Sequence, residues 1–246
     1  RTLNTLDVWV FSDTNINLAL KNNNFALPKE PYIRSKSNVE VYGVCGGYDS
    51  TFGLIAFLTA DGSPDVELWS YNSLGLTLLT TFKNANAIQS EGCVYDDENR
   101  ILFISEEQDR GILRAYTIND ELDFNSPSVI DNRAGLINGD PEGVTLYKTS
   151  KKEGYVIVSS QGDDTFNLYN RLSPHEYIGS FKIGHSKDID AVSDTDGISA
   201  INFNLNKDFS SGLFVAQDGT NDGKSKVKRQ NFKLVSFEEI LKSLDL

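Results

Sequence analysis

Four glycines recur along the chain at nearly constant spacing, and this repeat restricts the possible fold more than any other feature. Gly43, Gly92, Gly143 and Gly197 are separated by 49, 51 and 54 residues, and the last three directly follow an acidic residue. Short runs rich in Val, Ile, Phe and Tyr come after each glycine and favour strands. Four strands per period of about 50 residues are typical of a β-propeller blade. A β-sandwich would also contain many short strands, but it would not repeat the glycine turn at one fixed phase.

Strand-like segments occupy corresponding places in successive repeats. Second strands are expected at 54–58, 101–105, 155–159 and 212–216, and third strands at 66–71, 112–118, 166–169 and 231–237. Fourth strands are expected at 77–82, 127–130 and 177–183, and the last repeat shows none. Helical signal is confined to the end of the chain, where Ser236 precedes an acidic first turn.

The phase of the repeat indicates that the chain begins inside a blade. Residues 6–11 resemble a third strand and residues 25–28 a fourth. The chain also starts at Arg1 and contains no methionine. We therefore predict an all-β domain over residues 1–246, a β-propeller of four-stranded antiparallel blades with a short C-terminal helix. We expect it to lack the N-terminal blade or blades, because propellers close to hide their edges.

Composition excludes several classes of function. The 35 acidic and 23 basic residues give a net charge of −12, which argues against nucleic-acid binding through phosphate contacts. Two histidines leave little room for histidine-based phosphatase chemistry. No signal peptide and no run of about 18 apolar residues is present, so we expect no membrane span in this segment.

The two cysteines allow two interpretations. Cys45 and Cys93 fit no metal-binding spacing and are too few for a disulfide framework, so the favoured prediction is a pair of free, small core residues. They lie on inner strands of adjacent predicted blades, which is near enough for a disulfide, although their register parity differs by one residue.

Acidic residues are placed at the start of the predicted inner strands, which converge around the channel of a propeller. Glu91, Glu142 and Asp196 would share one space there. Like charges raise one another's pKa, and a bound cation removes that cost. Oxygen-only ligands suit Ca²⁺, and no Cys/His cluster supports zinc. Other acids and amides lie close by in the sequence and are alternatively solvated turn residues: Glu106, Glu107, Asp140, Gln161, Asp190 and Asp194.

Several ordered motifs resemble the β-propeller phytases, the calcium-dependent alkaline phytase family that includes 3-phytases. The matching stretches are Ser90-Glu91-Gly92, Asp140-Pro141-Glu142-Gly143, Ser193-Asp194-Thr195-Asp196-Gly197-Ile198 and Gly212-Leu213-Phe214-Val215-Ala216-Gln217-Asp218-Gly219. The resemblance implies a six-bladed propeller that holds several Ca²⁺ ions. It also implies a secreted, extracellular or periplasmic phosphomonoesterase, which takes phytate as its calcium salt and uses a metal-activated water.

The resemblance also implies roles for individual residues. Six residues are implied to be calcium ligands: Glu91, Asp140, Glu142, Gln161, Asp190 and Asp196. Among them, Asp190 is implied to bind a structural ion. Glu107 and Tyr42 fall in the phosphate-cleaving pocket, and Arg1 falls at the family's phosphate-binding arginine if a two-residue gap is allowed.

Two departures from the family pattern support an alternative function. The N-terminal signatures of the family are absent, so the missing N-terminal segment is an expected partner of the site. Asp61 lies where the family has a phosphate-gripping lysine, and a carboxylate there leaves the phosphate oxygens without a charged donor. The alternative is a non-catalytic, calcium-stabilised propeller that acts as a binding or structural module of an extracellular assembly.

Overall fold

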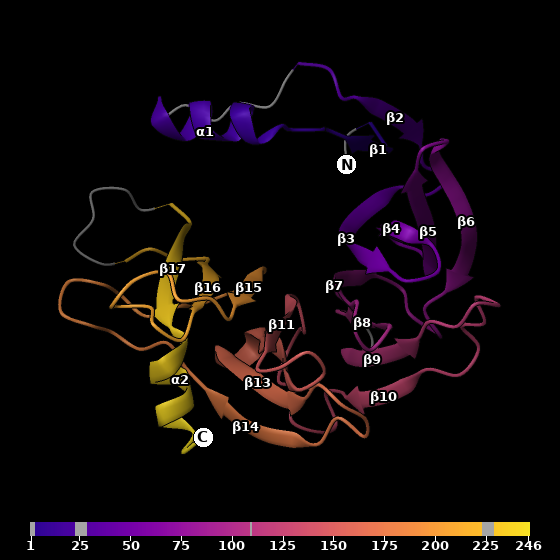
Figure 1. Cartoon of the computed structure of the whole chain (residues 1–246). Coiled ribbons are helices and arrows are strands. Elements are labelled where there is room, and N and C mark those ends of the chain that lie inside the picture. Colours follow the sequence, from indigo (N-terminus) through magenta and orange to yellow (C-terminus); the bar gives the residue numbers. More distant parts are fainter. Residues whose placement is uncertain (1–2, 23–28, 109, 223–228) are drawn as a thin grey trace.

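The computed structural model describes residues 3–22, 29–108, 110–222 and 229–246, and antiparallel sheets form most of it. Three sheets have four strands each and one has three, and strands that follow one another in the chain are neighbours in the sheet. These sheets succeed one another around an arc (Figure 1). The prediction of an all-β chain with four-stranded antiparallel sheets is therefore confirmed.

Each of these sheets consists of strands that are consecutive in the chain. The first sheet contains β3 (Val41–Asp49), β4 (Gly53–Ala60), β5 (Asp65–Asn72) and β6 (Gly75–Lys83). The second contains β7 (Ser90–Asp96), β8 (Ile101–Glu106), β9 (Ile112–Thr117) and β10 (Ser128–Asp131). The third contains β11 (Val144–Lys148), β12 (Gly154–Ser160), β13 (Thr165–Asn170) and β14 (Tyr177–Phe181). The fourth contains β15 (Ile198–Ile201), β16 (Leu213–Asp218) and β17 (Asn231–Ser236).

The strands predicted from the repeat all overlap observed ones. The fourth sheet has three strands among the described residues, as its sequence indicated. The expected C-terminal helix is α2 (Phe237–Ser243), which begins with Glu238 and Glu239 in its first turn. Acidic side chains there favour the helix because they face its positive end. Within the described ranges, no helix is long and apolar enough to cross a bilayer.

The N-terminal part differs from the sequence prediction. A helix, α1 (Asp13–Lys21), follows β1 (Thr5–Val8), whereas helical signal was expected only at the end of the chain. Its start is marked by Ser12, whose Oγ accepts a hydrogen bond from the Asn15 N–H at 3.2 Å. The strand that pairs with β1 is β2 (Ile33–Lys36). The segment predicted for that role, 25–28, lies outside the described residues.

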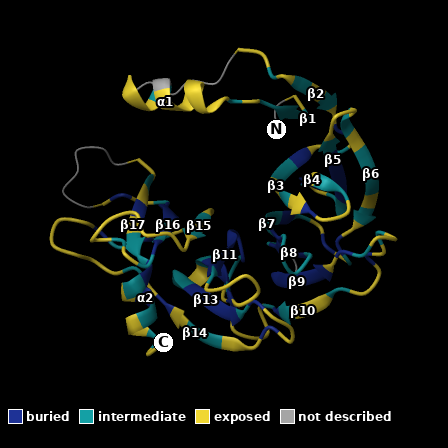
Figure 2. Ribbon diagram, in the orientation of Figure 1, coloured by how far each residue is buried: buried dark blue, intermediate teal, exposed yellow. Residues whose placement is uncertain are grey.

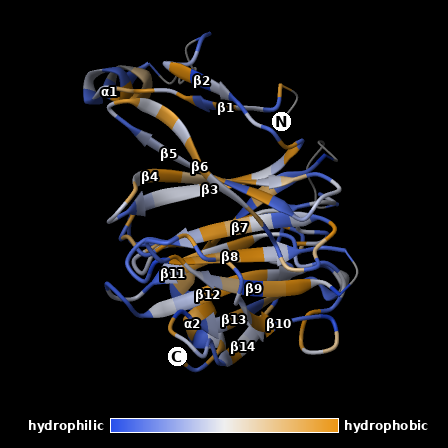
Figure 3. Ribbon diagram, turned by 90° about the vertical axis from the view of Figure 1, so that its right-hand side faces the viewer, coloured by the Kyte–Doolittle hydropathy of each residue, from blue (hydrophilic) through white to orange (hydrophobic). Residues whose placement is uncertain are grey.

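The core lies between neighbouring sheets. Figure 2 shows buried residues concentrated on inner and middle strands, such as β8 and β9, while β10 at the rim is largely exposed. Figure 3 shows these strands stacked on one another with their hydrophobic residues coloured orange. Fully or nearly fully buried side chains meet across the three sheet-to-sheet contacts, for example Phe57 with Leu102, Phe103 with Val158, and Phe166 with Phe214.

Cys45 and Cys93 form a disulfide, so the prediction of free thiols is wrong. Their Cα atoms are 5.6 Å apart, and both side chains border the core between the first and second sheets. The parity difference that argued against pairing is what turns the two side chains toward each other. Two sheets that stack face to face present opposite faces at their contact, so the paired residues must differ in parity.

Candidate functional site

The repeated glycines allow the inner strands of neighbouring sheets to approach closely. A Cβ on Gly92 would overlap the backbone oxygen of Glu142 in the next sheet. Ser105 on β8 accepts a hydrogen bond from the Gly92 N–H at 3.0 Å and donates one to the Glu142 backbone oxygen at 2.7 Å. The glycine–hydroxyl bond recurs in the sheets on either side, between Gly43 and Thr59 at 2.9 Å and between Gly143 and Ser159 at 2.9 Å.

This packing brings the residues before the repeated glycines close together, and three of the four are acidic. Gly43 lies against the backbone of Glu91. A Cβ on Gly143 would lie 3.0 Å from the Asp196 backbone oxygen. β3 therefore neighbours β7, β7 neighbours β11, and β11 neighbours β15. The close approach of these strands requires Gly43, Gly92 and Gly143, because a Cβ there would overlap the neighbouring strand.

Three glutamates form the centre of the site. One carboxylate oxygen from each of Glu91, Glu107 and Glu142 lies within 4.8 Å of the other two. Glu142 is buried, with 6 % of its surface exposed, and the other two are half-buried. Burial, together with the charges of Glu91, Glu107 and Asp196, raises the pKa of Glu142 to about 8.

Opposing interactions act on the pKa of Glu107. Burial raises its pKa, and the charge of Asp61 adds to that rise. Hydrogen bonds with Glu142 and Gln89 and the charge of Arg133 act in the opposite direction. Asp61, the residue that departs from the family pattern, is therefore close enough to act electrostatically on Glu107. The pKa of Glu107 is raised overall, so Glu107 and Glu142 both resist ionisation.

The other predicted ligands lie around this centre. Asp140 forms an ion pair with Arg133, whose guanidinium also donates to the Glu107 backbone oxygen. The Gln161 side chain donates to Asp196 at 3.2 Å. The Asp196 N–H in turn donates to the Gln217 side chain on β16 at 2.7 Å.

Tyr42 and Arg1 complete the predicted pocket. Tyr42 is half-buried on β3, directly before the glycine that contacts Glu91, so it lies beside the site. Arg1 lies outside the described residues.

Asp190 lies in a different polar group. Lys233 on β17 donates to Asp190 at 2.7 Å and to Asp218 at 2.7 Å. The Asp222 N–H donates to the second Asp190 oxygen at 2.7 Å. The lysine ammonium holds the pKa of Asp190 far below its usual range. The structure therefore gives Asp190 a cationic side chain as a partner, separate from the three-glutamate cluster.

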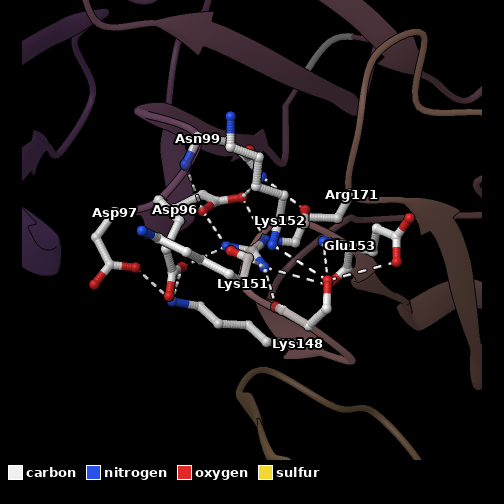
Figure 4. Close-up of polar contacts among 10 residues, drawn as sticks. Asp96, Asp97, Asn99, Lys148, Lys151, Lys152, Glu153 and Arg171 are labelled. Carbon is white, nitrogen blue, oxygen red and sulfur yellow. Dashed lines mark hydrogen bonds and ion pairs between the residues drawn. The ribbon is translucent and has the colours of Figure 1, made fainter.

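A second acidic group is neutralised by side chains of the protein. Asp96, Asp97 and Glu98 also bring their oxygens within 4.8 Å of one another. Arg171, fully buried, pairs with Asp96 and Glu98, and Lys148 pairs with Asp97 and Glu98 (Figure 4). Because two internal cations already compensate these carboxylates, this group has the character of a structural ion-pair network between the second and third sheets.

Sequence reasoning missed two residues of the site. Gln89 donates a side-chain hydrogen bond to the Glu107 carboxylate. Gln89 directly precedes β7, close to the repeated acidic-Gly pair, and this place in the repeat could have predicted that it lies near the other inner strands. Arg133 follows β10 in a connecting loop, and no repeat or motif marks it.

Comparison with known proteins identifies the family of the chain. The family model named Phytase matches residues 2–246. A 3-phytase of Bacillus subtilis (strain 168) is 38 % identical over 158 residues, which are 63 % of this chain and 40 % of that relative. The alignment therefore spans less than half of the relative's length.

Two solved structures align with much of this chain at low sequence identity. The structure of U3-55K has a TM-score of 0.49 and 12 % identity over 80 % of this chain and 53 % of its own. The RRP9 WD40 repeats have a TM-score of 0.48 and 11 % identity over 80 % of this chain and 52 % of their own. The assignment rests on the match to the family, which covers nearly every residue: the chain belongs to the phytase family.

Proposed function

We propose that the protein is a calcium-dependent phosphomonoesterase that releases phosphate from phytate, taken as its calcium salt. Membership of the phytase family supports the reaction and the substrate. The observation that carries the proposal is the cluster of Glu91, Glu107 and Glu142, with oxygens within 4.8 Å of one another. Such a cluster has the composition of a cation site and offers no histidine or cysteine nucleophile.

The donor set fits calcium. Six to eight oxygen ligands in flexible geometry are typical of Ca²⁺, and the site offers carboxylate and amide oxygens from several strands. The raised pKa of Glu142 reflects repulsion that a divalent cation would relieve. Glu91 and Glu142, with Asp140, Gln161 and Asp196 around them, are the residues that would hold calcium.

Asp190 is the proposed ligand of a separate structural ion, and that ion would have to displace the Lys233 ammonium. A calcium titration of Lys233→Gln would show tighter binding at this second site if the two cations compete. Equal binding by the variant and the wild type would exclude Asp190 as a ligand.

The chain's own residues prepare the site for a phosphate ester. When bound, calcium supplies positive charge that offsets the phosphate oxygens and lowers the pKa of a nearby water. Glu107 lies beside the glutamates that would hold the ion, and burial raises its pKa, so it holds a proton more readily than an ordinary glutamate does. Tyr42, on the neighbouring inner strand β3, is the residue proposed to orient the ester.

A second candidate function is favoured by Asp61. Its negative charge acts on Glu107, in the region where a phosphate would bind. A carboxylate there opposes phosphate binding, which suits a non-catalytic, calcium-stabilised module of an extracellular assembly. In either case the proposed fold is a six-bladed propeller, and the proposed location of the protein is outside the cell.

Phosphate release from phytate tests the proposal. The purified protein should release inorganic phosphate with saturating calcium and lose this activity in a chelator. Glu107→Gln should lower the rate by about 10²- to 10⁴-fold, the usual contribution of a general acid or base, with an unchanged circular dichroism spectrum. Glu239→Gln in α2 is the matched control and should keep full activity. A folded, calcium-loaded protein that releases no phosphate would refute the enzyme and leave the binding module.

A further inference from the structure

The Arg133 side chain contacts two segments of the site, the loop at Gly139 and Asp140 and the chain directly after β8 at Glu107. Its Nε donates to the Gly139 backbone oxygen at 2.6 Å. A terminal guanidinium nitrogen donates to the backbone oxygen of Glu107 and forms an ion pair with Asp140. One cationic side chain thus contacts both a predicted pocket residue and a predicted calcium ligand.

The backbone around Arg133 is built to place this guanidinium. The Arg133 N–H donates to the Arg110 backbone oxygen at 2.9 Å, which fixes the start of the side chain. The side chain then passes over Gly111, where a Cβ would lie 2.8 Å from Arg133 Nε. Gly111 also has a positive φ of 52°, so glycine is favoured there for two reasons. The contact therefore belongs to the folded site and is not a stray surface pairing.

Two groups compete for Asp140 under the proposed function. The carboxylate is paired with Arg133. It is also one of the oxygens that would hold calcium. The Asp140 side chain is 40 % exposed and that of Arg133 is 32 % exposed. An ion pair this accessible is weak enough for a divalent cation to displace.

We propose that Arg133 is a displaceable internal counterion, which occupies Asp140 in the metal-free protein and yields it to calcium. The proposal rests on the proposed function, because it takes Asp140 as a calcium ligand. Without an ion, the guanidinium partly neutralises the Glu107 and Asp140 side of a site crowded with carboxylates. With an ion, it keeps its contacts to the backbone oxygens of Gly139 and Glu107 and gives up the carboxylate.

The alternative is that Arg133 only fixes the two segments in place. The two roles make opposite predictions for calcium affinity. Loss of a competing cation tightens binding, whereas loss of a loop contact loosens it. Arg133→Gln therefore separates them by the sign of the change.

Isothermal titration of the chelator-treated protein with calcium chloride alone provides the test. Arg133→Gln is expected to bind calcium about three- to tenfold more tightly, because a competing charge is removed from a partly exposed site. In an Asp140→Asn background the gain should fall to less than twofold, because only the longer-range effect of the Arg133 charge on Glu107 remains. Lys242→Gln, which removes one positive charge from an exposed ion pair in α2, is the matched control and should bind within twofold of the wild type.

Arg133→Lys keeps the test decisive if the glutamine variant does not fold. A lysine keeps the charge but not the forked contacts, so its calcium affinity is expected to lie between wild type and Arg133→Gln. Equal or weaker binding by the Arg133 variants, or a gain of twofold or more in Asp140→Asn, would overturn the counterion role and leave the proposed function intact. A wild-type protein that binds no calcium would overturn both.

Discussion

Replacing Glu142 by glutamine should stabilise the metal-free protein at alkaline pH. The pKa of Glu142 is about 8 in the folded protein, against an ordinary value of 4.5. Between these values the folded protein holds a proton that the unfolded chain has lost, so its stability falls as the pH rises. Each pKa unit corresponds to about 1.36 kcal/mol. Ionised Glu142 therefore costs about 4–5 kcal/mol of folding free energy above pH 8.

Glutamine removes the charge and keeps the shape. Part of the cost remains, because a buried amide must also give up its water. We therefore expect Glu142→Gln to be about 2–4 kcal/mol more stable than the wild type at pH 9 in a chelator, a rise in Tm of roughly 5–15 °C. At pH 5 the wild-type carboxyl is protonated, and the two proteins should unfold together.

Thermal unfolding followed by circular dichroism at pH 5, 7 and 9 measures this difference. Glu238→Gln in α2 is the control with the opposite sign, because bonds to Lys242 and Ser210 lower the pKa of Glu238. That stabilisation is lost as the pH falls, so Glu238→Gln should gain nothing at pH 9. Calcium at a hundredfold excess over Kd adds about 2.7 kcal/mol to the wild type, so it should remove most of the difference between the wild type and Glu142→Gln. The reasoning is refuted if Glu142→Gln gains no stability at pH 9, or gains equally at pH 5.

Three further variants test the packing around the site. Changing Cys45 and Cys93 to serine should lower unfolding free energy by about 2–4 kcal/mol, seen as a lower urea midpoint that reductant no longer shifts. Gly92→Ala should cost about 1–3 kcal/mol, because its Cβ would overlap the next inner strand; Gly184→Ala, with open space around it, should change the midpoint little. Arg171→Met should cost about 3–5 kcal/mol, because it leaves a buried aspartate without its cation, and equal stability would contradict that assignment.

Local sequence determines the strands and the part of the site that is formed by the acidic residues of the repeat. Each strand follows from a short apolar run, and the spacing of the acidic-Gly pairs places successive sheets in the same phase. The convergence of Glu91, Glu142 and Asp196 follows from that phase, because each precedes or begins an inner strand. The sequence therefore predicts which acids approach one another without any knowledge of their contacts.

Contacts made by loops cannot be predicted from the repeat. Arg133 reaches Asp140 only because the segment after β10 folds back over Gly111, and this path depends on three loops at once. The disulfide shows the same limit in another form. Parity within a single sheet argued against it, whereas the face-to-face packing of two sheets requires residues of opposite parity. Helix α1 lacks a repeat partner, and only Ser12 marks its beginning.

The distribution of the carboxylates couples cation binding to the packing of the sheets. Glu91 lies on β7 and Glu107 directly follows β8 of the second sheet, whereas Glu142 precedes the third sheet and Asp196 precedes the fourth. No single sheet gathers all these charges, so much of the repulsion that raises the pKa of Glu142 arises when the inner strands come together. A cation that relieves it stabilises the contacts between sheets more than the sheets themselves. Calcium should therefore slow amide hydrogen exchange most on β7, β11 and β15, and least on the rim strands β10 and β14.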